Sequence, residues 1–251
     1  MRIIGSLADK ALYDIAKYLV LFLLVPFIIF LWRMDLLTTG FIISGVIYLA
    51  LVIVFCYHRY LLQTLVGIER VDRTMERGIN PNKALKMCTS NFRFLGIAAN
   101  KLVNSEEFER TLKRCGRGAE AIKFLLLSSE SRTLKFAASR AKKATEEYQD
   151  MVKHTLDRLK KFKEEDGYNI QVRLYRSEKD EDPPIFRLFF IDNQSVLVSY
   201  YVLGEGSGLQ MPQIQIIKNK GGKRVNTFYY AFDHYFNYLW DRSEEHDFTR
   251  R

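Results

Sequence analysis

The pattern of hydrophobic and polar positions separates an apolar N-terminal segment from a mixed remainder. Residues 18–32 (YLVLFLLVPFIIFLW) and 36–57 (LLTTGFIISGVIYLALVIVFCY) contain no charged side chain. A helix needs about 20 residues to cross the hydrocarbon core of a bilayer. The second run has that length, and the first reaches it with residues 15–17, if the Lys17 ammonium lies at the interface. The pattern predicts a transmembrane helical hairpin within residues 1–58; two buried helices of a soluble domain are the alternative.

Basic residues flank this apolar segment on both sides. They are Arg2, Lys10 and Lys17 before it and Arg59, Arg70, Arg73 and Arg77 after it. Since Lys and Arg favour the cytoplasmic side, we expect an inner-membrane protein with both termini and the soluble domain in the cytoplasm. Residues 1–14 have the spacing of an amphipathic interfacial helix, although an ordinary cytoplasmic start fits equally well.

Small residues and a proline distinguish the two expected spans. Pro26 predicts a kink in the first, and Gly40, Ser44 and Gly45 allow another helix to approach the second closely. That contact is either within the hairpin or between subunits. The uncharged runs hold no ionisable side chain, which argues against a carrier or proton relay. Because two helices cannot enclose a pore, conduction would require an oligomer; membrane disruption and plain anchoring are the other possibilities.

The remaining chain predicts a stalk and then an α/β domain. Residues 59–77 keep helical spacing, so a helical stalk or linker is expected over 59–87. Short apolar runs then alternate with amphipathic ones. The expected strands are 90–98, 122–129, 170–176, the hairpin 184–202 and 213–219, and the expected helices are 105–115, 129–165 and 226–240. This order predicts an α/β domain over 88–243 and a flexible tail over 244–251.

Charge and cysteine content narrow the classes of ligand. The chain has 38 Lys+Arg and 29 Asp+Glu, a net charge of +9, which permits binding to nucleic acid or anionic lipid without establishing either. Cys56, Cys88 and Cys115 have no pairing pattern and are expected as free thiols. No metal-binding Cys/His spacing and no phosphate-binding Gly-Lys-Ser/Thr loop occurs, so no metal or cofactor is expected.

The order of these elements, with the hairpin "FRLFFIDNQSVLVSYY" at its centre, resembles the phospholipase D-like fold, in particular its single-copy domains. Enzymes of that superfamily carry a His-x-Lys-x4-Asp motif followed by Gly-Ser, and the histidine is the nucleophile. With its aspartate aligned on Asp192, Arg187 takes the lysine position, Ile185 the histidine position and Ser199-Tyr200 the Gly-Ser position. Isoleucine can neither attack phosphorus nor transfer a proton, so the resemblance implies a domain that is not an enzyme, with no catalytic residues.

A binding role is still compatible with this motif. The planar guanidinium of Arg187 suits a phosphate or a carboxylate, whereas Asp192, in a turn, is expected to be structural. Further polar candidates at strand ends, each of which also fits a merely solvated or structural role, are Arg176, Lys218, Asn100, Ser128 and Tyr200.

The whole arrangement resembles two-span membrane effectors of bacterial antiviral defence, the Hailong type among them. The resemblance implies a ligand-controlled, pore-forming or membrane-disrupting oligomer, a dimer or tetramer, whose sensor domain binds a nucleotide or a short oligonucleotide. A non-catalytic tether that places a protein partner at the membrane is the alternative. A membrane-bound phosphodiesterase is a third reading, which the missing histidine weakens.

Overall fold

The computed structural model describes residues 36–61, 66–140, 144–176, 186–200, 210–218 and 227–248. The chain divides into two compact units, Met1–Tyr60 and Leu61–Arg251. The expected first span with Pro26 and the amphipathic start at 1–14 lie outside the described residues.

In the first unit, the second apolar run forms a single helix, α2 (Leu36–Leu61). Large apolar side chains along it are exposed, among them Ile47, Leu51 and Phe55. Gly40, Ser44 and Gly45 lie in the first half of the helix, and a Cβ added at Gly45 would meet no atom within 4 Å. The side chains described in α2 are those of residues 42–43 and 45–60.

Over the described residues, no helix combines the length and the apolar character that crossing a membrane requires.

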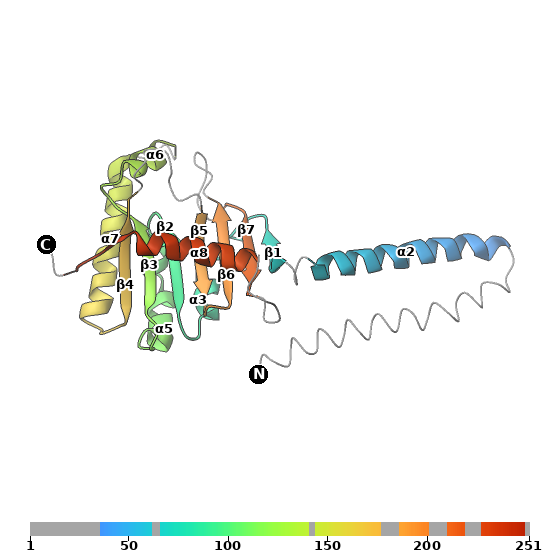
Figure 1. Ribbon diagram of the computed structural model, residues 1–251, viewed down its shortest axis with the longest axis horizontal. Helices are drawn as coiled ribbons and strands as arrows, with labels where there is room; N and C mark the ends of the chain where they lie inside the picture. Colours follow the sequence, from blue (N-terminus) through green and yellow to red (C-terminus); the bar gives the residue numbers. More distant parts are fainter. Residues whose placement is uncertain are drawn as a thin grey trace. The chain divides into compact units, whose positions relative to one another are not determined.

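The second unit is built on one eight-stranded sheet flanked by helices (Figure 1). In sheet order the strands are β1 (Ile68–Asp72), β7 (Gln213–Ile217), β6 (Ser195–Tyr200), β5 (Phe186–Ile191), β2 (Phe92–Gly96), β3 (Ile122–Leu127), β4 (Ile170–Tyr175) and β8 (Glu244–Glu245). Strands β2, β3 and β4 are parallel to one another, and every other pairing is antiparallel. The helices are α3 (Pro81–Met87), α4 (Asn100–Val103), α5 (Glu106–Cys115), α6 (Arg132–Arg140), α7 (Thr145–Glu164) and α8 (Phe228–Asp241). The expected α/β class is confirmed.

Both faces of the sheet are covered, so its central strands are continuously apolar. Side chains alternate between the faces of a strand. On one face Phe124 and Leu126 of β3 enter a core with residues of α3, α4, α5 and α7. On the other, Leu125 and Leu127 pack in a core with α8, which crosses the strands (Figure 1).

Local chemistry explains where several helices begin. Asn80 caps α3 by accepting a hydrogen bond from the Lys83 amide, with Pro81 in the first turn. Ser105 caps α5 in the same way, accepting from the Phe108 amide. Part of the aromatic run in α8 forms core: Phe236 is fully buried, whereas Phe228 and Tyr238 are exposed.

Three expectations about element boundaries were wrong. The helical stalk expected over 59–87 does not exist as such: α2 ends at Leu61, Ile68–Asp72 is a strand paired with β7, and α3 contributes to the first core. The α/β unit therefore begins near Gly67, well before residue 88. Pairing with β7, some 145 residues away by sequence, outweighed a weak local helical spacing.

The flexible tail expected over 244–251 was the second wrong expectation. Glu244–Glu245 pairs with β4, the His246 amide donates to the Val172 carbonyl at 2.9 Å, and Phe248 is buried in the first core. The long helix expected over 129–165 is two helices, α6 and α7, separated by a segment that includes residues 141–143, which are not described.

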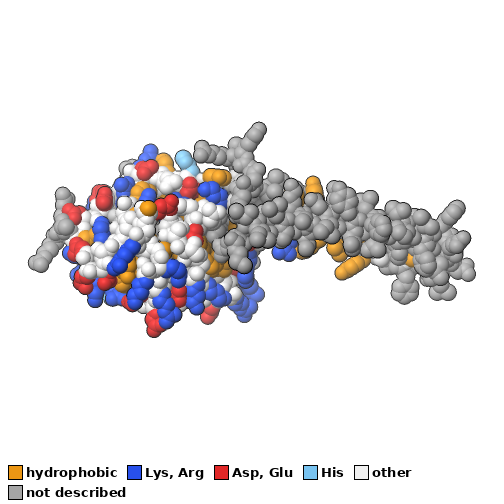
Figure 2. All heavy atoms as spheres, turned by 90° about the horizontal axis from the view of Figure 1, so that it is seen from below, with side chains coloured by type: hydrophobic (Ala, Val, Ile, Leu, Met, Phe, Trp, Pro, Cys, Tyr) orange, Lys and Arg blue, Asp and Glu red, His pale blue; other side chains and the backbone are white. Residues whose placement is uncertain are grey.

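Basic and acidic side chains are intermixed on the face seen in Figure 2. The ion pairs of α7 and α5 show the same mixing, for example Arg158 Nη2 to Glu109 Oε1 at 3.0 Å. On this face the basic side chains are thus interspersed with acidic ones rather than gathered in one stripe.

Candidate ligand-binding site

The sheet topology gathers most of the candidate residues at one edge. Parallel strands β2, β3 and β4 all end there, and because β5 is antiparallel to β2, it begins there. By the same alternation β6 ends and β7 begins at this edge. Asn100, Ser128 and Arg176 follow the first three strands, and Arg187 is the second residue of β5.

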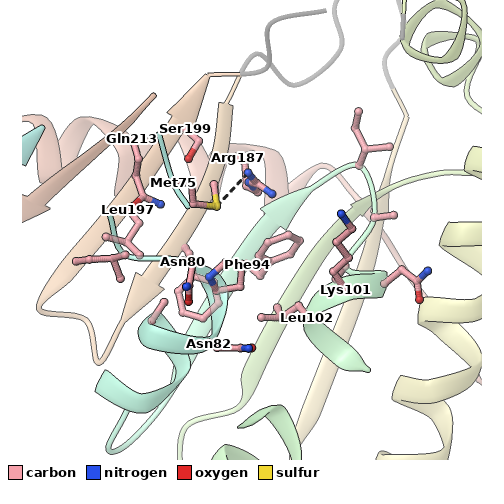
Figure 3. Close-up of a pocket in the computed structure, with 18 of the residues that line it drawn as sticks. Met75, Asn80, Asn82, Phe94, Lys101, Leu102, Arg187, Leu197, Ser199 and Gln213 are labelled. Carbon is pink, nitrogen blue, oxygen red and sulfur yellow. Dashed lines mark hydrogen bonds between the residues drawn. The ribbon is translucent and has the colours of Figure 1, made fainter. Parts of the chain in front are cut away.

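Arg187 belongs to a row of three polar residues on neighbouring strands. It pairs with Ser199 of β6, and Ser199 pairs with Gln213 of β7. Residues directly opposite in antiparallel strands project from the same face, and all three line one cavity of about 490 Å³ (Figure 3).

The floor and walls of this Arg187 cavity come from several elements. Apolar side chains of the sheet form part of it, namely Phe94, Phe189 and Leu197. Polar side chains from outside the sheet also line it: Asn80 and Asn82 at the start of α3, Asn100 and Lys101 of α4, Glu76, and Tyr148 of α7. The cavity is therefore an apolar hollow bordered by amides, by two cations, Arg187 and Lys101, and by the carboxylate of Glu76, and such a mainly apolar hollow with a few polar groups is the usual composition of a small-molecule site.

The guanidinium of Arg187 contacts a methionine in this cavity. Its Nη2 donates to Sδ of Met75 at 3.4 Å (Figure 3). Met75 is itself buried, and its amide donates to the Met211 carbonyl at 2.9 Å. A thioether is a weak hydrogen-bond acceptor, so this bond by itself contributes little to fixing the guanidinium.

Gln213 is the residue of this row that the sequence did not single out. It is 3% exposed, and its Oε1 has no hydrogen-bond partner within the part of the chain that the structure describes. An unpaired buried amide oxygen costs about 1–3 kcal/mol, a cost that a donor on a bound ligand would remove. Only the register of β6 and β7 places Gln213 beside Ser199, so the sequence carried no signal for it.

The predicted candidates do not form one constellation. Arg187 and Asn100 reach the cavity, where Asn100 accepts a hydrogen bond from Asn104. Ser128 is buried nearby, and its Oγ accepts from the Glu130 amide. Arg176 lies at the same edge but pairs with Glu130 at 2.8 Å on the surface.

The other two candidates are placed differently. Lys218 follows β7 at the opposite edge of the sheet, where its amide donates to the Gln194 carbonyl. Tyr200 ends β6, and its side chain is not described. Ile185, at the position of the missing nucleophile, lies outside the described residues.

Asp192 has the structural role expected of it. Its carboxylate accepts hydrogen bonds from the amides of Thr89, Ser90 and Asn91 at 2.9–3.2 Å and from the Thr89 hydroxyl at 2.6 Å. Burial alone would raise the pKa of this carboxyl, but these hydrogen bonds outweigh burial and hold the pKa below its ordinary value. Asp192 thereby ties the β5–β6 turn to the segment before β2, at the edge opposite Arg187.

Among the described residues, no group of three or more His, Cys, Asp or Glu side chains could hold a metal ion. The described side chains that line the Arg187 cavity include neither histidine nor cysteine.

No protein-family model matches the sequence, and neither does any curated protein sequence. Among solved structures the chain is similar to TrmBL2, an archaeal chromatin protein whose structure shows a novel mode of DNA binding, with 12% identity and a TM-score of 0.41 over 81% of this chain and 66% of that one. It is also similar to Nuc of Salmonella typhimurium, a phospholipase D family member, with 11% identity and a TM-score of 0.39 over 67% of this chain and 89% of that one.

A third similar structure is the phosphatidylserine synthase of Haemophilus influenzae Rd KW20, with 9% identity and a TM-score of 0.42. This likeness covers 66% of this chain and 35% of the synthase. At such identities and scores, these similarities assign neither an activity nor a residue role to this chain.

Proposed function

We propose that this protein is a ligand-controlled membrane effector whose phospholipase D-like domain is non-catalytic and binds a nucleotide or short oligonucleotide in the Arg187 cavity. The observation that carries the proposal is the row Arg187–Ser199–Gln213, which presents a cation, a hydroxyl and an unpaired amide oxygen to one apolar hollow.

The chemistry of the cavity suits such a ligand. Its volume of about 490 Å³ lies within the 300–1,000 Å³ typical of small-molecule sites. Arg187 and Lys101 would meet phosphate oxygens, and the amides of Asn80, Asn82 and Gln213 would meet the polar edge of a base. Phe94, Phe189 and Leu197 would exclude water from its faces.

The absence of catalysis is proposed on chemical grounds. Phosphoryl transfer through a covalent intermediate needs a nucleophile and a group that moves a proton. Arg187 supplies neither, because its guanidinium stays protonated, and the residue two positions earlier is Ile185. Since the motif histidine is replaced, binding without turnover is the role that we propose for the cavity.

The membrane part of the proposal is supported by the uncharged runs 18–32 and 36–57 and by the exposed apolar side chains of α2. We propose that these runs form a hairpin in the inner membrane, that Gly40 and Ser44 mediate contact within a dimer or tetramer, and that the assembly acts in antiphage defence. A ligand can shift such an assembly only if it binds two of its states with different affinity.

The test uses detergent-purified full-length protein and a panel of cyclic dinucleotides, short DNA and short RNA oligomers at two salt concentrations. We expect saturable binding that Arg187→Gln weakens by about 10- to 100-fold, since a charge-assisted hydrogen bond contributes about 1.5–3 kcal/mol. The matched control is Arg110→Gln, an exposed arginine of α5 paired with Glu106, and it should bind as the unaltered protein does.

Liposome leakage measured with and without the bound oligomer then shows whether the ligand activates or inhibits membrane disruption. Binding that ignores Arg187, or that disappears at the higher salt in all variants, would overturn the nucleotide-sensor proposal. The domain would then act as a tether for a protein partner.

A further inference from the structure

Helix α8 has one side covered by the sheet and one side that is exposed. Through Tyr229, Phe236 and Trp240, which are buried, it packs on β4, β6 and β7. It crosses the strands, so its other side faces away from the sheet (Figure 1). On this outer side Tyr235 is half-buried, and the remaining residues are exposed: Ala231, His234, Tyr238, Asp241 and Arg242. Tyr238 is 48% exposed, an unusual position for an aromatic side chain with no covering element among the described residues.

Four of these residues have the spacing of a seam between two helices. Ala231, Tyr235, Tyr238 and Arg242 follow one another at intervals of four, three and four residues, which is the alternation of the contact positions in paired helices. The Arg242 guanidinium lies 3.8 Å from the centre of the Tyr238 ring. The seam therefore presents two aromatic rings, a methyl group and the apolar stem of an arginine.

This seam is complementary to itself when two copies of α8 pack antiparallel. A two-fold axis through the middle of the helix places Tyr235 opposite Tyr238 of the partner subunit. It also places Ala231 opposite Arg242 of the partner subunit, so the shortest side chain of the seam faces the longest one. Such alternation of large and small residues lets two helices interdigitate, and two tyrosine rings can pack offset against each other.

The charges beside the seam fit the same arrangement. His234 and Asp241 lie on one flank of it, seven residues apart. In an antiparallel pair this flank meets the same flank of the other copy, which brings His234 beside Asp241 of the partner subunit, once on each side of the axis. An imidazole N–H can donate to that carboxylate. Within the chain, Asp241 acts electrostatically on Lys123 but forms no ion pair with it in the described part of the structure.

We propose that the outer side of α8 is a homodimer interface, in which two copies of this chain pack α8 antiparallel with Tyr235 and Tyr238 at its centre. The interface lies in the α/β unit, so it is separate from the contact proposed for Gly40 and Ser44, and it does not depend on a ligand in the Arg187 cavity. One helix pair buries a small area, and the subunits should therefore exchange. Covalent trapping is the appropriate measurement for such a contact.

The experiment uses Ala231→Cys/Arg242→Cys in full-length protein in native membranes, with Cys56→Ser as background because Cys56 is an exposed free thiol. The two new cysteines are eleven residues apart, about 16 Å along one helix, so they cannot form a disulfide within a subunit. In the antiparallel pair each faces the other cysteine of the partner. We expect mild oxidation to give a covalent dimer on a non-reducing gel.

A charge exchange tests the proposed register. His234→Asp in this cysteine background places two carboxylates together on each flank, and it should lower the cross-linked fraction by about fivefold, since two exposed ion pairs are lost. His234→Asp/Asp241→Lys restores opposite charges across the interface and should restore the cross-link. An effect of His234→Asp on the folding of one subunit would not be reversed in this way, and near-ultraviolet circular dichroism checks that packing is unchanged.

Two controls match these variants. Lys153→Cys/Glu164→Cys places cysteines at exposed positions with the same spacing on α7, and Lys113→Asp introduces a carboxylate at an exposed position of α5. The first should give no more than background cross-linking, and the second should leave the α8 cross-link unchanged. A dimer band no stronger than that of the α7 pair would overturn the proposal. So would a band that His234→Asp leaves unaltered, or one that the charge exchange fails to restore.

Discussion

Arg187 donates a hydrogen bond to Met75, although the two residues are 112 positions apart in the chain, with Nη2 3.4 Å from Sδ. Met75 comes from the turn after β1, a segment that the sequence pattern assigned to a stalk. This contact shows that the N-terminal part of the α/β unit helps to build the cavity rather than merely connecting it to α2.

Substitution of Met75 tests whether Arg187 faces a ligand. Met75→Leu conserves volume and removes only a weak acceptor, so the free energy of unfolding should change by less than about 1.5 kcal/mol. Met75→Glu places a carboxylate next to the guanidinium, and it should lower the affinity for an anionic ligand by about tenfold through competition. Calorimetry on both variants measures this. Equal affinity in the Leu and Glu variants would show that Arg187 does not contact the ligand.

Asp192→Asn should destabilise the domain by about 2–3 kcal/mol at pH 7, because a charged acceptor of several hydrogen bonds is replaced by a neutral one. The pKa of Asp192 is lowered in the folded state. Its stabilisation is therefore fully present above the unfolded pKa, about 3.9, and is lost as the pH falls through the folded pKa.

Urea unfolding at pH 7 and at pH 3 measures this effect through tryptophan fluorescence. The difference between unaltered protein and Asp192→Asn should be larger at pH 7 than at pH 3. Asp166→Asn, at an exposed position after α7, is the control. A pH-independent difference would mean that the carboxylate charge is not what stabilises the turn.

Phe248→Ala should cost about 3 kcal/mol, in the range for an aromatic removed from a core. Phe248 packs in the first core, and its carbonyl accepts a hydrogen bond from Lys160 Nζ at 2.6 Å. The matched control is Tyr238→Ala, an exposed aromatic of α8, whose removal should have little effect. Thermal denaturation compares them, and equal midpoints would support the loose tail expected from the sequence.

Alanine substitutions at two glycines with positive φ distinguish the effect of a steric clash from that of backbone strain. Gly67 has φ +80 and Gly167 φ +69, but a Cβ at Gly67 would lie 2.7 Å from the Ile217 carbonyl oxygen, whereas one at Gly167 meets nothing within 4 Å. Alanine at either position should lower the free energy of unfolding by about 1–2 kcal/mol, because a side chain disfavours the left-handed conformation. We expect Gly67→Ala to be the less stable of the two, since its Cβ also disturbs the β1–β7 pairing. Denaturant midpoints that coincide would exclude this clash.

The sequence located the β5–β6 hairpin and the helices α5 and α8 because each depends on local chemistry. Alternation, a serine before a helix and aromatic residues at helical spacing are readable within a few residues. Arg187 and Asn100 could be identified as candidates for the same reason, since both stand at the ends of apolar runs.

Tertiary structure alone decided which of these candidates meet. Strand β1, the short β8 and the burial of Phe248 depend on backbone partners far away in the sequence, and a polar pair such as Glu244–Glu245 gives no local sign of them. The same is true of Gln213, which joins Arg187 only through the register of three strands, and of Lys218, which the topology moves to the opposite edge. Local pattern specifies what a segment can form, but sheet order and register are set by the packing of the whole domain.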